Sequence, residues 1–273
     1  MKILISVDIE GIASVFHPEQ TRAGNPEYER ARRLMTLEAN AVIEGAFAGG
    51  ATEVLVNDSH GGFRNLLPDL LHPSASAILG KPRLLGMMSG VETGVDAVMM
   101  VGYHGRSQSS GILAHTINSF AFARVWLNDL ELGEAGIYGA LAGEFGVPVI
   151  FGSGDDIFVD EAKLLFPQAN LISVKMAQGN TSGISISPQR AVTLLAEGAE
   201  AAMHTIKDAA PFVLQPQITC KLQTQSPALA DCFCQLPILQ RIDGVNVSFS
   251  APSVQYAVRI LNSLSAMSFM LRN

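Results

Sequence analysis

The sequence has few charged residues and few cysteines, and each shortage excludes a class of protein. Charged residues make up 16% of the 273 residues and hydrophobic residues 48%, so the chain can bury a large core and is not typical of a disordered protein. Its 25 acidic residues outnumber its 18 basic ones and no basic stripe occurs, which argues against a nucleic-acid partner. Three cysteines in a chain of this length do not make a disulfide framework.

Long hydrophobic runs are also missing. A membrane helix needs about 18 consecutive apolar residues, and no run in this sequence approaches that length. The apolar run at the N-terminus is interrupted at Asp8, which makes it too short and too acidic for a signal peptide. We therefore expect a cytoplasmic protein with no membrane partner.

Short apolar runs alternate with helical patterns along the chain, which is typical of an α/β protein. The expected strands cover residues 2–7, 53–56, 97–102, 149–151 and 171–174. The expected helices cover residues 28–48, 134–145, 156–165, 188–208 and 253–270. This order predicts a mixed, largely parallel sheet flanked by helices.

The character of the sequence changes in its last third. Residues 212–249 are rich in Gln, Ser and Pro, and "VNVSFS" alternates as a strand does. A polar stretch, "QGNTSG", lies near residue 180. We therefore expect an α/β domain over residues 1–180 and a smaller α+β lobe over residues 181–273, the lobe belonging to the same compact unit and to an oligomer interface.

Acidic residues and histidines occur where expected strands give way to loops, and a further acid opens an expected helix. The stretches are "VDIEG" with Asp8 and Glu10, "NDSHGG" with Asp58 and His60, "VGYHG" with His104, "LAHT" with His115, and "LGEAG" with Glu134. The carboxyl ends of parallel strands meet at one edge of a sheet, so these side chains can converge there. Carboxylates and imidazoles are the ligands that zinc takes, and five of them suit two metals about 3.5–4 Å apart.

Each of these residues can also be explained without metal binding, and the spacing alone does not decide between the two explanations. Asp8 and Glu10 lie on one face of an extended chain and repel each other, unless a cation lies between them or the strand end is exposed. The stretch "NDSHGG" is also a plausible turn, His104 a buried core histidine, and Glu134 an acid favoured by a helix dipole. His115 also fits an exposed loop.

Taken together, "SVDIEGI", "EVLVNDSHGG", "VGYHGRSQSSGILAHT", "LNDLELGEAG" and "GSGDD" resemble the D-aminopeptidases of the dipeptide-transport operon type, a family of di-zinc metallopeptidases. The resemblance covers roughly the first 175 residues. It implies that zinc is bound by Asp8, Glu10, His60, His104 and Glu134, with Asp8 bridging two ions per chain, and that His115 is the catalytic residue. It also implies a homodecamer of two stacked pentameric rings. Near "VKMAQGN" the chain carries Asn180 where relatives tend to have an arginine.

The function expected from these residues is a metallo-aminopeptidase that cleaves short peptides, and the resemblance adds an N-terminal D-residue such as D-Ala. The metals would activate a water molecule, and His115 would move protons or stabilise the oxyanion. Mn²⁺ and Co²⁺ share the ligand set with Zn²⁺. One alternative is another metal-dependent hydrolase, acting on amides or phosphoesters at the same site. A second alternative is a non-catalytic metal-binding ring protein.

Overall fold

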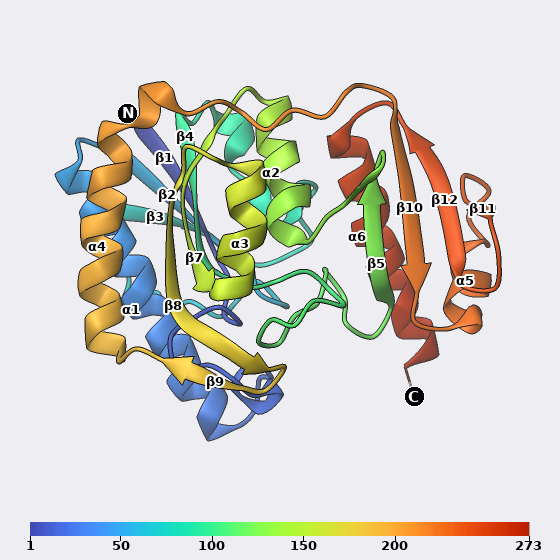
Figure 1. Ribbon diagram of the computed structural model, residues 1–273, viewed down its shortest axis with the longest axis horizontal. Helices are drawn as coiled ribbons and strands as arrows, with labels where there is room; N and C mark the ends of the chain where they lie inside the picture. Colours follow the sequence, from blue (N-terminus) through green and yellow to red (C-terminus); the bar gives the residue numbers. More distant parts are fainter. Residues whose placement is uncertain (273) are drawn as a thin grey trace.

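Two β-sheets organise the chain, as Figure 1 shows for the computed structural model, which describes residues 1–272. Sheet A has the order β3-β2-β1-β4-β7-β8-β9, and its strands are Ala75–Ile78, Glu53–Asp58, Lys2–Val7, Ala97–Tyr103, Val149–Asp155, Asn170–Gly179 and Ser182–Ser185. All neighbours in it pair parallel except β8 and β9. Sheet B is antiparallel, with the order β11-β12-β10-β5-β6 and the strands Gln240–Arg241, Asn246–Ala251, Ile218–Thr224, Phe122–Leu127 and Leu130–Glu131.

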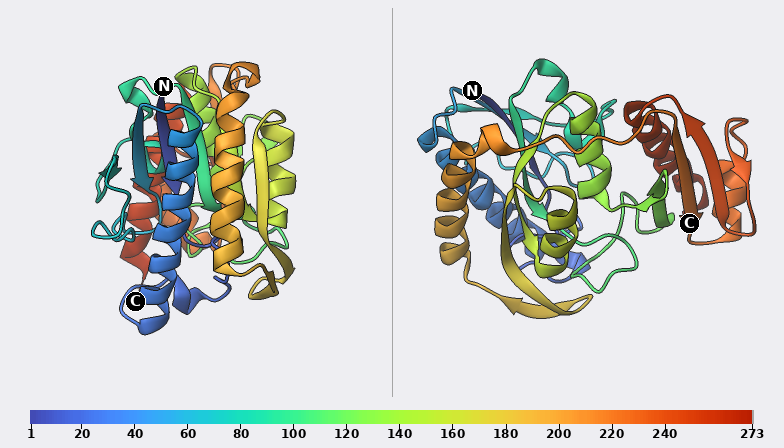
Figure 2. Two further views of the ribbon diagram at one scale, coloured as in Figure 1. Left: turned by 90° about the vertical axis from the view of Figure 1, so that its left-hand side faces the viewer. Right: turned by 45° about the horizontal axis from the view of Figure 1, so that its top comes forward.

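Helices cover both faces of sheet A (Figure 2). One face carries α1 (Pro26–Ala48) and α4 (Pro188–His204), which pack on each other, and the other carries α2 (Glu134–Glu144) and α3 (Asp156–Leu165). Helix α6 (Val254–Met267) contacts both α2 and sheet B, and α5 (Pro227–Phe233) contacts β10. Short 3₁₀ helices cover Pro18–Gln20 (η1), Gly86–Met88 (η2), Val91–Thr93 (η3), Ile206–Asp208 (η4) and Ser268–Leu271 (η5). Helix α6 thus joins the two sheets into one layered body.

Strand β1 is buried on both faces, and its alternating side chains enter two hydrophobic clusters. Ile3, Ile5 and Val7 pack with residues of α1 and α4. Leu4 points the other way, into the cluster that α2, α6 and sheet B share. A strand with no polar face is typical of the centre of a parallel sheet, and its end is therefore a well-shielded place for charged groups.

The predicted α/β fold with a largely parallel sheet is confirmed, and the five expected strands and five expected helices all form; β1 and α3 have the predicted ends, and the ends of the other elements are shifted. Helix α1 begins at Pro26 because the Asn25 side chain accepts a hydrogen bond from Tyr28 N, which caps the helix. The stretch "VNVSFS" is β12, as expected. In sheet B, β10 pairs with β12 on one side and with β5 on the other, and the sequence did not predict the pairing with β5. The boundary near residue 180 stays a prediction; β9 and α4, which follow it, belong to sheet A and to the layer beside it.

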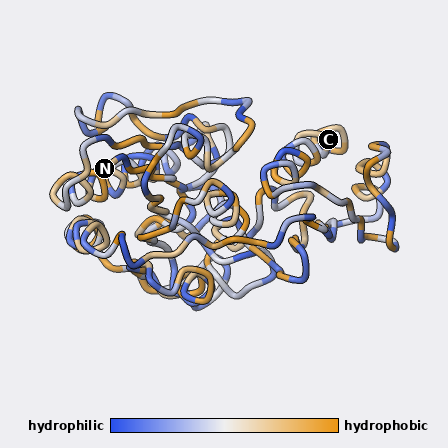
Figure 3. Tube along the Cα trace, turned by 90° about the horizontal axis from the view of Figure 1, so that it is seen from above, coloured by the Kyte–Doolittle hydropathy of each residue, from blue (hydrophilic) through white to orange (hydrophobic). Residues whose placement is uncertain are grey.

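Hydrophobic and hydrophilic stretches alternate along the whole trace (Figure 3). Among residues 1–272, no helix combines the length and the apolar character that crossing a membrane requires.

Candidate metal centre

Three neighbouring strands of sheet A deliver the candidate ligands to one edge. Strands β2, β1 and β4 lie side by side and run parallel, so their carboxyl ends meet. Asp8 and Glu10 follow β1, His60 comes two residues after β2, and His104 comes directly after β4. Their exposed fractions confirm a shielded edge: 2% for Asp8, 4% for Glu10 and 3% for His104.

Two glycines allow the ends of β1 and β4 to approach closely. A Cβ atom on Gly11 would lie 1.9 Å from Tyr103 O, and one on Gly102 would lie 2.3 Å from Asp8 O. Instead, Gly11 N donates a hydrogen bond to Gly102 O at 2.7 Å. A side chain at either position would push apart the two backbones that carry Asp8 and His104.

The Asp8 carboxylate lies between two histidines and faces each with a different oxygen. Its Oδ1 is 3.3 Å from His60 Nδ1, and its Oδ2 is 3.5 Å from His104 Nε2. Glu10 Oε2 lies 3.0 Å from the same nitrogen of His60. The geometry therefore contains two adjacent groups of donor atoms that share one carboxylate.

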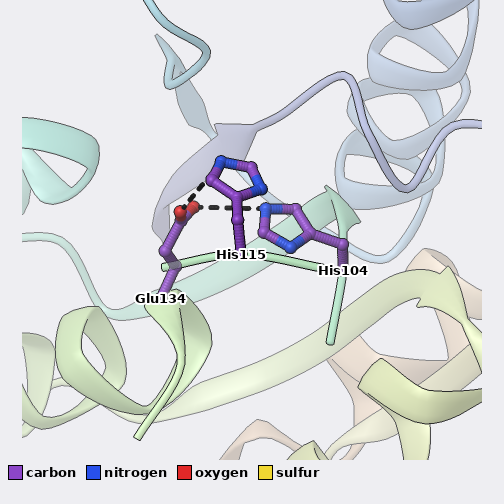
Figure 4. A group of neighbouring side chains, drawn as sticks. All are labelled: His104, His115 and Glu134. Carbon is purple, nitrogen blue, oxygen red and sulfur yellow. Dashed lines mark ion pairs between the residues drawn. The ribbon is translucent and has the colours of Figure 1, made fainter. Parts of the chain in front are cut away.

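Glu134 and His115 complete the cluster from the other side (Figure 4). Glu134 is the first residue of α2, where the helix dipole favours an acid, and its Oε2 lies 3.5 Å from His104 Nε2. Its Oε1 lies 3.5 Å from His115 Nε2 and accepts a hydrogen bond from Ile117 N at 2.6 Å. The rings of His104 and His115 stack, with centroids 4.3 Å apart. All six residues predicted for the site thus lie in one cluster.

Backbone carbonyl groups fix the orientation of each histidine ring. Thr21 O lies 2.8 Å from His60 Nε2, Gly105 O lies 3.0 Å from His104 Nδ1, and Leu113 O lies 2.9 Å from His115 Nδ1. A carbonyl can only accept, so each of these ring nitrogens carries the proton. The opposite nitrogen, which faces the carboxylates, then has a free lone pair in the neutral ring, as a metal-binding histidine requires.

Charge compensation inside the cluster shifts the pKa values of its members. Burial alone would raise the pKa of Glu10, but His60, with smaller contributions from His115 and His104, outweighs it, and the pKa lies well below its usual range. Burial would lower the pKa of His60 and of His104, but the carboxylates beside them raise both pKa values well above 6.5. Without a metal, protons on the two histidines therefore balance the buried carboxylates.

The residues present fit a metal ion. Glu10 Oε2 and His104 Nε2 are buried and have no hydrogen-bond partner among residues 1–272. Two three-residue groups, Asp8 with Glu10 and His104, and His104 with His115 and Glu134, each place one donor atom per residue within 4.8 Å of one another. Buried polar atoms without partners are rare because they cost free energy, and nitrogen and carboxylate donors of this kind suit Zn²⁺.

A cavity of about 430 Å³ adjoins the cluster and makes it accessible. His60, His115 and Glu134 form part of its wall. Residues of α6 and η5, including Asn262, Ser265 and Phe269, also form part of its wall. A ligand in this cavity would touch the cluster on one side and the C-terminal helices on the other.

The sequence did not reveal several residues that support the cluster. Lys175, on β8, is 2% exposed, and its Nζ donates hydrogen bonds to Glu10 O and Val15 O. Asp155 Oδ2 accepts from Ile112 N at 2.7 Å and so holds the loop that leads to His115. Asn180 O accepts from Leu113 N at 2.8 Å, which places this departure from the family pattern against the same loop. Asp155 stands in "GSGDD", and Lys175 and Asn180 stand in "VKMAQGN", but neither stretch predicts these contacts.

Asp58, which stands in one of the motifs, has a structural role instead. Its carboxylate accepts hydrogen bonds from Leu66 N and Asn65 Nδ2, both at 2.7 Å, and burial raises its pKa. It therefore shapes the loop that carries His60 rather than joining the donor cluster.

Comparisons with known proteins agree with this geometry. A family described as D-aminopeptidase matches residues 1–263. A D-aminopeptidase of Bacillus subtilis (strain 168) is 37% identical over 197 residues, which are 72% of each chain. The structure of a Zn-dependent D-aminopeptidase, DppA from Bacillus subtilis, described as a self-compartmentalizing protease, superposes with a TM-score of 0.95 at 30% identity, over 98% of both chains. The chain therefore belongs to the D-aminopeptidase family and is a peptidase.

Proposed function

We propose that this protein is a zinc aminopeptidase that removes an N-terminal D-residue such as D-Ala from short peptides, with two zinc ions per chain. The observation that carries the proposal is the Asp8 carboxylate, whose two oxygens face two different histidines at 3.3 and 3.5 Å. A shared carboxylate is the feature that distinguishes a two-metal site from a single one.

The donor atoms divide into two sets around Asp8. Glu10 and His60 would hold one ion with Asp8 Oδ1, and His104 and Glu134 the other with Asp8 Oδ2. When bound, the ions supply Lewis acidity, polarising the scissile carbonyl and lowering the pKa of water. Mn²⁺ and Co²⁺ remain alternatives that the donor types do not separate from Zn²⁺.

His115 would move the protons of the reaction. Its Nδ1 is engaged with Leu113 O, so its Nε2 is the atom free to accept or donate a proton. That nitrogen lies 3.5 Å from Glu134 Oε1, and the residue lines the cavity. The imidazole ring can take a proton from the nucleophile at this nitrogen and give it to the leaving amine.

The D-residue preference and the assembly rest on the relatives. Both the curated relative and the solved structure are D-aminopeptidases, and the latter is called self-compartmentalizing. We extend both properties to this chain, as a homo-oligomer with the two stacked pentameric rings that the family resemblance implies. A closed chamber would admit short peptides and exclude folded proteins.

The test combines metal analysis with a substrate comparison. Purified protein should contain about two transition metals per chain. It should hydrolyse D-Ala-D-Ala faster than L-Ala-L-Ala, lose activity on chelation and regain it with Zn²⁺. Amide and phosphoester substrates belong in the same assay, because dinuclear sites also serve those reactions. Turnover of the D-peptide by metal-free protein, or a faster rate on the phosphoester, would refute the proposal.

A further inference from the structure

We propose that the cavity beside the metal centre binds the free C-terminal carboxylate of the peptide at Lys81, with Arg83 behind it. The inference rests on the proposed peptide hydrolysis and adds the residue that recognises the far end of the substrate. Neither cation belongs to the donor cluster or follows one of the motifs read from the sequence.

Both cations lie on the wall of the cavity that also holds His60, His115 and Glu134. A peptide whose reacting bond is at the metal centre would extend along this wall, since the cavity of about 430 Å³ continues from one to the other. Glu134 is the only carboxylate that lines the cavity within residues 1–272, and its oxygens already face His104 and His115. The wall of the cavity therefore carries two cationic side chains, Lys81 and Arg83, and one carboxylate that is already engaged by histidines.

Neither Lys81 nor Arg83 forms an ion pair with any residue in the described part of the chain. The nearby acid, Asp58, is engaged by Asn65 and Leu66. Two cations that line a cavity and lack a counter-ion indicate that an anionic ligand binds between them and the metal centre.

The two cations are held in place by neutral groups. The Arg83 guanidinium stacks on the Phe63 ring, 3.8 Å from its centroid, and donates to Asn57 Oδ1 and Asp58 O. Lys81 Nζ lies 5.4 Å from the centroid of the same ring and donates to Gly61 O at 2.9 Å. An ammonium group has three donors, so two remain on Lys81 for a carboxylate.

The charge of the site selects the end of the peptide. Burial lowers the pKa of Lys81, and repulsion by Arg83 and Arg64 lowers it further. An anion beside Lys81 would relieve this repulsion, whereas the ammonium group of a peptide would add to it. The amino end must therefore point away from Lys81, toward the carboxylates of the metal centre, and the free carboxylate toward Lys81.

The experiment compares a peptide acid with its amide in the zinc-loaded protein. With the native enzyme, KM for D-Ala-D-Ala should be about tenfold lower than KM for D-Ala-D-Ala amide. Lys81→Gln should raise KM for the acid about tenfold, change kcat by less than about twofold, and leave KM for the amide nearly unchanged. Lys81→Arg should restore much of the loss. Lys163→Gln, an exposed lysine on α3 outside the cavity, removes the same charge and should change neither KM.

Equal KM values for acid and amide in the native enzyme, or an equal rise for both in Lys81→Gln, would overturn the inference. A native enzyme that cleaves neither peptide would instead refute the proposed function. In that case calorimetric titration of D-Ala-D-Ala and its amide into zinc-loaded His115→Ala, with and without Lys81→Gln, still decides the inference. Binding of the acid that does not depend on Lys81 would refute it.

Discussion

Replacing Glu38 with glutamine should stabilise the protein, and more at pH 8 than at pH 5. Glu38 lies on α1 and is 2% exposed. Its Oε1 accepts a hydrogen bond from Ala13 N at 2.8 Å, while its Oε2 is buried without a partner among residues 1–272. Burial raises the pKa of Glu38 from 4.5 to about 7, because the Ala13 amide and Lys175 offset only part of the lost hydration.

The sign and size of the effect follow from this pKa. Between pH 4.5 and about 7 the folded protein binds more protons at Glu38 than the unfolded chain does. The contribution of Glu38 to stability is therefore fully present below pH 4.5 and is lost as the pH rises through 7. Since each unit of pKa is worth 1.36 kcal/mol, the ionised carboxylate costs about 3 kcal/mol at pH 8 and about 1 kcal/mol at pH 5.

Glutamine keeps an oxygen for the Ala13 amide and carries no charge, so it avoids this cost. For a chain of this size 1 kcal/mol corresponds to about 2–4 °C in Tm, which gives a gain of about 6–12 °C at pH 8 and about 2–4 °C at pH 5. The measurement is the difference in Tm between variant and wild type at each pH, at equal metal and protein concentration. Titration of the histidines affects both proteins equally and does not contribute to this difference.

Glu44→Gln is the matched control, because Glu44 lies on the same helix, is exposed, and undergoes the same chemical change. It should shift Tm by no more than about 2 °C at either pH, as surface substitutions usually do. If Glu38→Gln raised Tm equally at both pH values, or lowered Tm at pH 8, ionisation of the buried Glu38 carboxyl would not be what destabilises the wild-type protein at pH 8.

Four further predictions concern the metal centre. His115→Ala should lower kcat by about 10²–10⁴-fold, while the metal content, measured by plasma mass spectrometry, stays the same. If the variant kept the wild-type kcat, His115 would not be the residue that transfers protons. Asp8→Asn should lower the metal content at both positions, whereas Glu10→Gln should leave about one ion per chain, and equal losses would argue against a shared carboxylate. Because the carboxylates raise the pKa values of His60 and His104 above 6.5, the metal-free protein should release about two protons on binding zinc near pH 7, measurable by calorimetry in buffers of different ionisation enthalpy. The same shifts predict that the metal-free protein loses stability as the pH rises through those raised pKa values, and an unchanged Tm would contradict them.

The positions of the metal-ligand candidates could be predicted from the sequence, because each one follows the end of a strand or opens a helix. Asp8 follows β1 and His104 follows β4, so predicting the strands and a largely parallel sheet placed both side chains at one edge, and the structure shows that β1 and β4 are neighbours there. Sheet order also explains why His60, which is some fifty residues from either, reaches the same edge. The hydrophobic pattern marks where each strand ends, and a parallel sheet places those ends at one edge, so the clustering of these side chains could be predicted.

Other features depend on contacts that no short stretch encodes. Strand β5 pairs with β10, which begins 91 residues after the end of β5, and the register of such a pair cannot be read from either strand. Lys175 resembles a solvent-facing lysine in sequence, yet its ammonium group is buried beneath the loop that carries Glu10. Lys81 and Arg83 stand in a segment without regular structure, so only the folded chain brings them to the cavity.

The chain order of the cavity has a consequence for biosynthesis. The six residues of the donor cluster lie between Asp8 and Glu134, but the cavity wall also includes Asn262 and Phe269, which are translated at least 128 residues after Glu134. At about 5–20 residues per second, translation from one to the other takes on the order of ten seconds. Until β10 has been translated, the edge of β5 that pairs with it has no partner, and its backbone hydrogen-bonding groups are exposed. A nascent chain, or one truncated before α6, would therefore carry the donor cluster open to solvent, and the substrate cavity is enclosed only once α6 and η5 have been made.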